Sequence, residues 1–204
     1  IFNTGYAANT GIIPAVSGEG DVIFSDELNH ASIIDGCRLS RAKTVVYRHR
    51  DVAHLAALMK KEEGKRTMVV TDTVFSMDGD TPDLSEIIKI CNTYNCFLYI
   101  DEAHAIGLFG ENGAGLTYRY ADQVAIAVYP LGKAPGFQGA FVCGNQFVKE
   151  TLINQGRGFI FTTAQPPFHA YVMLKILKYL QSPDAGERRN KVLSRASDFC
   201  SHLK

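Results

Sequence analysis

Short apolar runs alternate with helical patterns along the whole chain. Helical patterns show apolar residues three or four positions apart, as at Val52, Leu55 and Met59. They predict helices over Ala31–Leu39, Val52–Glu62, Leu84–Tyr94, Phe147–Gln155, Pro167–Leu180 and Ala185–Leu203. The short apolar runs predict strands over Val22–Ser25, Thr44–Tyr47, Arg66–Asp72, Cys96–Ile100, Val124–Val128 and Ala140–Cys143.

This alternation is typical of an α/β fold, a mainly parallel sheet sandwiched by helices and wound with right-handed crossovers. No linker, repeat or charge block divides the 204 residues, which suffice for one sizeable core. We therefore expect one domain over residues 1–204. The chain begins without a Met and ends inside an amphipathic run, so we expect it to be part of a longer protein.

The composition argues against nucleic-acid binding, membrane association and metal binding. Lys+Arg and Asp+Glu balance at 21 each, so no global field favours nucleic acid or a membrane surface as a partner. No apolar run approaches the ~18 residues of a membrane span, and no signal peptide is visible. The five cysteines show neither CxxC pairs nor metal-ligand spacing, so we expect reduced thiols, no metal site and a cytoplasmic protein.

Three chemically capable side chains follow predicted strands. Ligands of an open α/β sheet bind beyond the carboxyl ends of its strands. Asp101 directly follows one predicted strand, and Ser76 and Lys133 follow two others. We therefore expect all three on the same rim of the sheet.

Asp101 lies in the segment Tyr99–His104 (YIDEAH). A carboxylate at a buried strand end needs a cationic partner, and a protonated pyridine nitrogen would serve. His104, three residues later, could reach a ring hydroxyl. The alternative is an Asp that caps a turn beside a surface His. Helicases also contain Asp-Glu-Ala-His, but the chain has no GxxxxGK[ST] phosphate loop.

Lys133 lies in a glycine-bounded turn, Leu131–Gly136 (LGKAPG). A lysine that is shielded from water is a nucleophile toward an aldehyde. An exposed loop lysine is the alternative, and it is usually right for a single Lys. Only the combination with Asp101 favours a cofactor site.

Two further segments offer weaker signals. Gly5 precedes a helix start, where its N–H and that of Tyr6, with Thr4, could hold a phosphate; a plain helix cap is the alternative. His30 opens another predicted helix, where its ring could stack on a planar cofactor or be structural. Ser76 lies in a polar turn, Val74–Asp80, rich in Asp and Gly.

Together these segments resemble the α-oxoamine synthase family of fold-type I pyridoxal-phosphate (PLP) enzymes. The matching segments follow one another in the family's order and cover nearly the whole chain: Gly5–Asn9 (GYAAN), Asn29–Ser32 (NHAS), Val74–Asp80 (VFSMDGD), Asp101–Gly115 (DEAHAIGLFGENGAG), Leu131–Lys133 (LGK) and Phe161–Pro167 (FTTAQPP). The resemblance implies the large domain of an aspartate aminotransferase-like PLP-dependent transferase. An N-terminal segment and a C-terminal small domain would lie outside the sequence.

The resemblance also implies roles. Lys133 would hold PLP as a Schiff base and later move protons, Asp101 would pair with the pyridine nitrogen, and His30 would stack on the ring. His104 and Ser76 would bond around the ring oxygen. Gly5 and Tyr6 would hold the phosphate.

Thr162 or Thr163 would reach the phosphate of the neighbouring subunit, because the family's sites form at a homodimer interface. The arginine that would bind the substrate carboxylate would lie beyond Lys204.

The implied reaction condenses an amino acid with an acyl thioester and releases CO2. The segment VFSMDGDTPDL favours the members that join L-alanine to pimeloyl-CoA or pimeloyl-ACP in biotin biosynthesis. Pro130 departs from the family, which usually has a hydroxyl residue three positions before the lysine. Other α-oxoamine synthases, a fold-type I aminotransferase or lyase, and a non-catalytic homologue stay open as alternatives.

Overall fold

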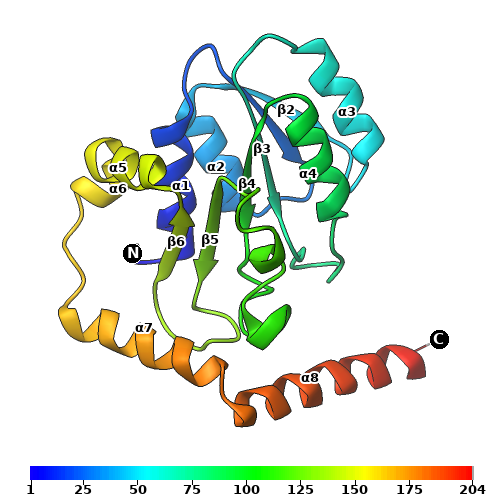
Figure 1. Ribbon diagram of the computed structural model, residues 1–204, viewed down its shortest axis with the longest axis vertical. Helices are drawn as coiled ribbons and strands as arrows, with labels where there is room; N and C mark the ends of the chain where they lie inside the picture. The colour runs from blue at the N-terminus through cyan, green and yellow to red at the C-terminus, as the bar shows by residue number, and fades with distance from the viewer. Residues whose placement is uncertain (204) are drawn as a thin grey trace.

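The computed structural model describes residues 1–203, which form one six-stranded sheet in the order β2-β1-β3-β4-β5-β6 (Figure 1). Neighbouring strands are parallel except for β5 and β6, which are antiparallel. The mainly parallel sheet is therefore confirmed. The strands are β1 (Val22–Asp26), β2 (Lys43–Tyr47), β3 (Thr67–Asp72), β4 (Phe97–Asp101), β5 (Ile126–Pro130) and β6 (Ala140–Gly144).

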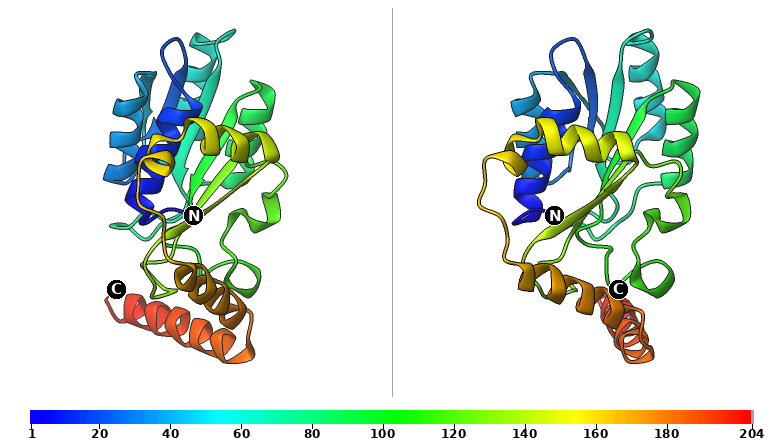
Figure 2. Two further views of the ribbon diagram at one scale, coloured as in Figure 1. Left: turned by 90° about the vertical axis from the view of Figure 1, so that its left-hand side faces the viewer. Right: turned by 60° about the vertical axis from the view of Figure 1, so that its left-hand side comes forward.

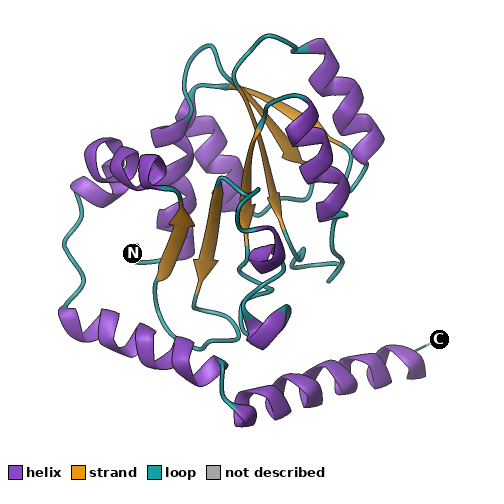
Figure 3. Ribbon diagram, in the orientation of Figure 1, coloured by secondary structure: helices purple, strands orange, loops and turns teal. Residues whose placement is uncertain are grey.

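The helices cover both faces of this sheet (Figure 3). Their bounds agree with the predicted ranges to within two residues, except that α1 was predicted only as a helix start and α6 was not predicted. They are α1 (Gly5–Val16), α2 (Ala31–Ser40), α3 (Val52–Lys61), α4 (Leu84–Thr93), α5 (Gln146–Gln155), α6 (Arg157–Ile160), α7 (Pro167–Leu180) and α8 (Pro183–His202), with short 3-10 turns η1 (Glu111–Gly113) and η2 (Thr117–Tyr120).

Strand β5 lies two residues later than predicted. The N–H of Val124 donates to the carbonyl of Tyr120 and so completes the preceding turn instead of joining the sheet. At the other end Pro130 belongs to the strand, where it lies opposite Ala140 of β6. A proline is tolerated there because Ala140 makes its backbone hydrogen bonds with Phe2, so the pair needs no N–H from Pro130.

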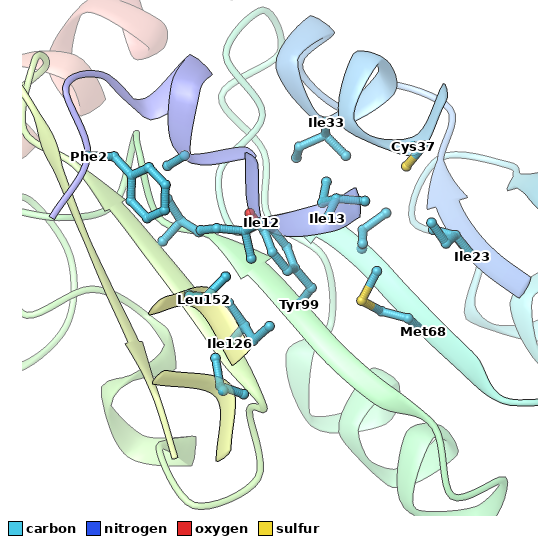
Figure 4. Close-up of a cluster of buried hydrophobic side chains, with 14 of the residues drawn as sticks. Phe2, Ile12, Ile13, Ile23, Ile33, Cys37, Met68, Tyr99, Ile126 and Leu152 are labelled. Carbon is cyan, nitrogen blue, oxygen red and sulfur yellow. The ribbon is translucent and has the colours of Figure 1, made fainter. Parts of the chain in front are cut away.

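Successive side chains along each strand point to opposite faces of the sheet, so the core forms two layers. On one face α1, α2 and α5 pack over side chains that include Tyr99, Met68 and Ile126 (Figure 4). On the other, α3 and α4 pack over Leu98 and Ile100 (Figure 2). Because side chains alternate along a strand, Asp101 points to the same face as Tyr99, the one covered by α1.

Helices α7 and α8 lie along the edge of the sheet at which β5 ends (Figure 1). His169 of α7 contacts this edge, since its Nε2 lies 2.8 Å from the carbonyl oxygen of Gln138. Within residues 1–203, no helix combines the length and the apolar character that crossing a bilayer requires.

Gly36 sets the close approach of α1 and α2. A Cβ at this position would lie 2.7 Å from the carbonyl oxygen of Asn9 and 2.9 Å from Cδ1 of Ile13. We predict that Gly36→Ala forces the two helices apart and lowers the free energy of unfolding by about 1–3 kcal/mol, as overpacking does. Gly18→Ala is the matched control, because a Cβ there meets nothing within 4 Å. Urea unfolding of both variants tests this, and equal stabilities would contradict it.

Candidate active site

A cavity of about 300 Å³ opens at the carboxyl ends of β3, β4 and β5. It brings together seven of the residues predicted from sequence, Gly5, Tyr6, His30, Ser76, Asp101, His104 and Lys133. The shared rim expected for Asp101, Ser76 and Lys133 is confirmed.

A larger cavity of about 440 Å³ lies at the opposite, amino ends of the strands. It is mostly apolar, and its charged groups, Asp21 and Arg66, pair with each other. The first cavity therefore concentrates more chemically capable groups than this one does.

Asp101 forms the floor of the cavity and is only 3% exposed. Its Oδ2 accepts a hydrogen bond from Asn9 Nδ2 at 2.7 Å, and its Oδ1 accepts one from the N–H of Ala103 at 2.8 Å. Burial raises the pKa of Asp101, although these two hydrogen bonds and the nearby His30 and Lys133 oppose the rise. None of the ion pairs within residues 1–203 involves this carboxylate.

Asn9 connects Asp101 to the rest of the site through a buried network. Its amide nitrogen donates to Asp101 and also to the Ser32 hydroxyl at 2.9 Å. Its amide oxygen accepts the Tyr99 hydroxyl at 2.6 Å. Both N–H groups of the Asn9 amide donate and its oxygen accepts, so the amide has one orientation and holds Asp101 in place.

The same network orients His30. The N–H of Ser32 donates to Nδ1 of His30 at 3.2 Å, so Nδ1 carries a lone pair and not a proton. The Ser32 hydroxyl, 2.7 Å from the same nitrogen, is therefore also a donor. The remaining ring proton lies on Nε2, and the ring of His30 is held at the cavity wall.

Asp72 is a second buried carboxylate beside Asp101, its register partner on the neighbouring strand. It also lines the cavity and accepts the N–H of His30 at 3.0 Å. Burial, together with the charge of Asp101, raises its pKa well above the ordinary value. The cavity floor therefore combines two acids that disfavour each other's ionisation, which suits a cationic ligand.

Lys133 and His104 occupy the mouth of the cavity. Lys133 is exposed, so the expectation that the protein shields it from water is wrong for this part of the chain. The glycine-bounded turn leaves it on the outer side of the rim. His104 is half-buried, and burial, followed by the nearby Lys133 and His30, holds its pKa below the ordinary value. His104 is therefore neutral at neutral pH.

The first turn of α1 forms another wall. Thr4 caps the helix by accepting the N–H of Ala7 at 3.0 Å, and the N–H groups of Gly5 and Tyr6 precede the first intrahelical bond. Gly5 packs on Pro130, since a Cβ at Gly5 would lie 2.6 Å from Cγ of that proline. The two residues fit each other, and neither adds a hydroxyl to this wall.

Thr162 and Thr163 do not line this cavity. Both are exposed, after α6, and the Thr162 hydroxyl accepts a hydrogen bond from Asn3 at 3.4 Å. Their predicted contact would be made to a neighbouring subunit.

Sequence reasoning missed Asn9, Ser32 and Asp72. Asn9 and Ser32 end two of the segments on which the resemblance was based, but nothing in those segments assigned them a partner. Asp72 ends a predicted strand and Asp101 directly follows one, so the rule that ligands bind at strand ends could have identified Asp72 as well.

The residues of the cavity fit PLP. The buried Asp101 offers an acceptor for a pyridinium, the first turn of α1 offers N–H donors for a phosphate, and Lys133 offers an amine at the mouth. Acid, amine and helix terminus thus surround one cavity.

This fold is that of the fold-type I PLP-dependent enzymes. The chain belongs to the aminotransferase class I and II family, whose model matches residues 1–204. Its resemblance to the α-oxoamine synthases is also confirmed: it is 48% identical, over 169 residues, to 8-amino-7-oxononanoate synthase of Anaeromyxobacter sp. (strain K). That match covers 82% of this chain and 42% of the relative.

Two solved structures extend the comparison. A variant of serine palmitoyltransferase from S. paucimobilis, with a bound PLP–myriocin aldimine, has a TM-score of 0.88 and 31% identity over 96% of this chain and 49% of that one. 8-Amino-7-oxononanoate synthase from Francisella tularensis has a TM-score of 0.76 and 37% identity over 89% and 53%. The chain spans about half the length of the curated relatives it matches.

Asn9→Ala tests the buried network. The variant removes the donor to Asp101 and Ser32 and leaves the buried Tyr99 hydroxyl without its acceptor. We predict that the free energy of unfolding falls by about 1–3 kcal/mol, the effect of leaving buried polar groups unpaired. Asn154→Ala is the control, because that exposed amide contacts only the carbonyl of Glu150 in its own helix. Urea unfolding near neutral pH measures both, and an Asn9→Ala variant as stable as the control would refute the network.

Proposed function

We propose that this chain is the PLP-binding large domain of an α-oxoamine synthase that joins L-alanine to a pimeloyl thioester, releases CO2 and so forms 8-amino-7-oxononanoate for biotin biosynthesis. The observation that carries the proposal is a single cavity with the acid Asp101 at its floor and the amine Lys133 at its mouth. The identity to 8-amino-7-oxononanoate synthases supports the choice within the family.

PLP, when bound, supplies an aldehyde that condenses with amines and a ring that withdraws electrons from a neighbouring carbon. Asp101 would accept a hydrogen bond from the protonated pyridine nitrogen and keep it charged, since the Asn9 amide holds the carboxylate in place. His30 stacks on the ring, and its orientation follows from Ser32. The neutral His104 and Ser76 hydrogen-bond around the ring oxygen.

Lys133 has two roles in this proposal. Its Nζ would be the group that attaches the cofactor to the protein when no substrate amine is bound. The free amine would then take the proton from the substrate Cα, so that this carbon can form a bond to the acyl carbon while the carrier leaves as a thiol. Exposure at the mouth of the cavity leaves Lys133 able to reach both positions.

The phosphate site of this chain rests on the N–H groups of Gly5 and Tyr6 at the start of α1. We further propose a homodimer in which Thr162 or Thr163 of one subunit reaches the phosphate of the other. The segment around them exposes large apolar side chains, among them Phe159, Phe161 and Phe168, which a subunit interface would cover. The free cysteines support a cytoplasmic location.

Lys133→Ala tests the covalent role. Borohydride reduction of the PLP-treated wild-type chain should leave a pyridoxyl group on Lys133, identified by mass spectrometry of the peptides. We predict that Lys133→Ala loses this group, whereas the exposed Lys149→Ala keeps it. If Lys133→Ala still carried a pyridoxyl group on another lysine, Lys133 would not be the residue that binds the cofactor.

The substrate assignment is tested by thioester-dependent CO2 release from the full-length protein. Alanine, glycine and serine are each paired with a short acyl donor and with the longer pimeloyl donor. Each donor is supplied on coenzyme A and on acyl carrier protein. We predict release only with alanine and a pimeloyl donor. Exclusive use of glycine would instead favour glycine C-acetyltransferase (2-amino-3-oxobutyrate CoA ligase). Amino transfer to a keto acid without a thioester would favour an aminotransferase.

A further inference from the structure

A cluster of charged side chains outside the cavity joins three loops at the carboxyl edge of the sheet. His49, in the turn between β2 and α3, lies between two carboxylates. Its Nδ1 is 2.8 Å from Oδ1 of Asp26, and its Nε2 is 3.1 Å and 3.3 Å from the carboxylate oxygens of Asp80. An ionised carboxylate only accepts, so both ring nitrogens donate and His49 is an imidazolium.

Other donors hold Asp26 in place. Its side chain is fully buried and also accepts the N–H groups of Leu28 and Arg50, at 3.0 Å and 2.9 Å. Arg50 adopts a left-handed backbone conformation, φ 57°, at this contact. Non-glycine residues avoid that region unless their surroundings hold them there, so the turn is built around the Asp26 carboxylate.

The charged groups that face His49 come from each packed element. Asp26 ends β1 and Glu27 follows it, and Glu27 accepts the N–H of His49 at 2.7 Å. Asp80 belongs to the loop after β3. Arg50, on the same turn as His49, donates to Asp80 at 2.7 Å. Two carboxylates thus contact the ring, a third bonds the His49 backbone and the one guanidinium bonds Asp80, a balance that favours the imidazolium.

The loop after β3 connects this cluster to the cavity. The ring of His49 stands perpendicular on the buried Phe75, with centroids 4.3 Å apart. The N–H of Phe75 donates to the carbonyl of Asp80, and the N–H of Gly79 donates to the carbonyl of Phe75. The turn from Phe75 to Asp80 is therefore held at both ends, and Ser76, which lines the cavity, follows Phe75 directly.

We propose that His49 is a positioning residue for the candidate active site. By bridging Asp26 and Asp80 it keeps the loop that leads to His30 and the turn that carries Ser76 in a fixed relation. The bridge itself depends only on the fold, whereas its effect on cofactor binding rests on the proposed function.

The bridge has a defined pH dependence. Burial opposes the charge of His49, but the hydrogen bonds to Asp26 and Asp80 outweigh it and raise the pKa of His49 above its ordinary value. The stabilisation is therefore complete below the ordinary imidazole pKa of about 6.5 and is lost as pH rises through the folded-state pKa. Burial works against ionisation of Asp80, but His49 and Arg50 lower its pKa, so it stays ionised throughout.

Hydrogen exchange of the cofactor-free chain tests the bridge. The amides of Phe75 and Gly79 are followed from about pH 6 to about pH 9, with correction for intrinsic base catalysis. Wild-type protection should fall as His49 loses its proton. His49→Gln should be about tenfold less protected at the acidic end, the lower range for a hydrogen bond to a charged group, and should show no such fall. His54→Gln is the control: its ring accepts the N–H of Arg48 in the same turn and is expected to leave the wild-type behaviour intact.

Asp80→Asn provides a second variant that keeps the shape of the turn. It should move the midpoint of the protection change to lower pH, because it removes one charge that favours the imidazolium. An unmoved midpoint, equal protection of wild type and His49→Gln at every pH, or NMR signals of a neutral His49 ring at neutral pH would each overturn the bridge.

PLP titration then tests the positioning role. His49→Gln should bind PLP about tenfold more weakly than wild type, and His54→Gln should bind it equally well, as measured by absorbance. A bridge that is present in the exchange data but has no effect on PLP affinity overturns the positioning role. A wild-type protein that binds no PLP removes the proposed function instead, and the exchange rates alone then decide on the bridge.

Discussion

Burial of the Asp101 carboxylate is the constraint on which the rest of the site depends. A charge removed from water is costly unless donors or an opposite charge surround it. Asn9 and the N–H of Ala103 provide two donors, but Asp72 places a second acid alongside. The pKa values of both acids are raised, so the stability they contribute is complete only below about pH 3.9 and is lost as pH rises. At neutral pH a cationic ligand in the cavity would offset this loss.

Helix α1 links that constraint to the core. Its first turn faces the cavity, Asn9 holds Asp101 one turn later, and Ile12 and Ile13 are fully buried against the sheet (Figure 4). The glycine at position 36 lets α2, which carries Ser32 at its start, approach closely enough for the two helices to share one polar network. Packing of the core and placement of the candidate site residues are therefore parts of one arrangement.

How much of the fold and the candidate site could be predicted from sequence depends on how far apart in the chain the interacting residues lie. Periodicity predicted the strands and helices, and the rule for strand ends predicted that Asp101, Ser76 and Lys133 share a rim. The contacts of Asn9 join residues 92 and 23 positions apart, and they depend on side-chain directions that no local pattern encodes. The exposure of Lys133 was also unpredictable, because it depends on which elements cover the end of the sheet.

The cavity divides into a rigid floor and an exposed wall, and the two parts suit different tasks. Asp101 and its network are buried and hydrogen-bonded, so in the proposed function the floor would recognise the ring nitrogen of the cofactor. It cannot discriminate between acyl donors. His30, Ser76 and Lys133 are exposed, so substrate choice depends on this wall and on what lies over it. If Lys133 moves a substrate proton as proposed, that step is favoured where water is excluded, and covering Lys133 is a role that suits the proposed partner subunit.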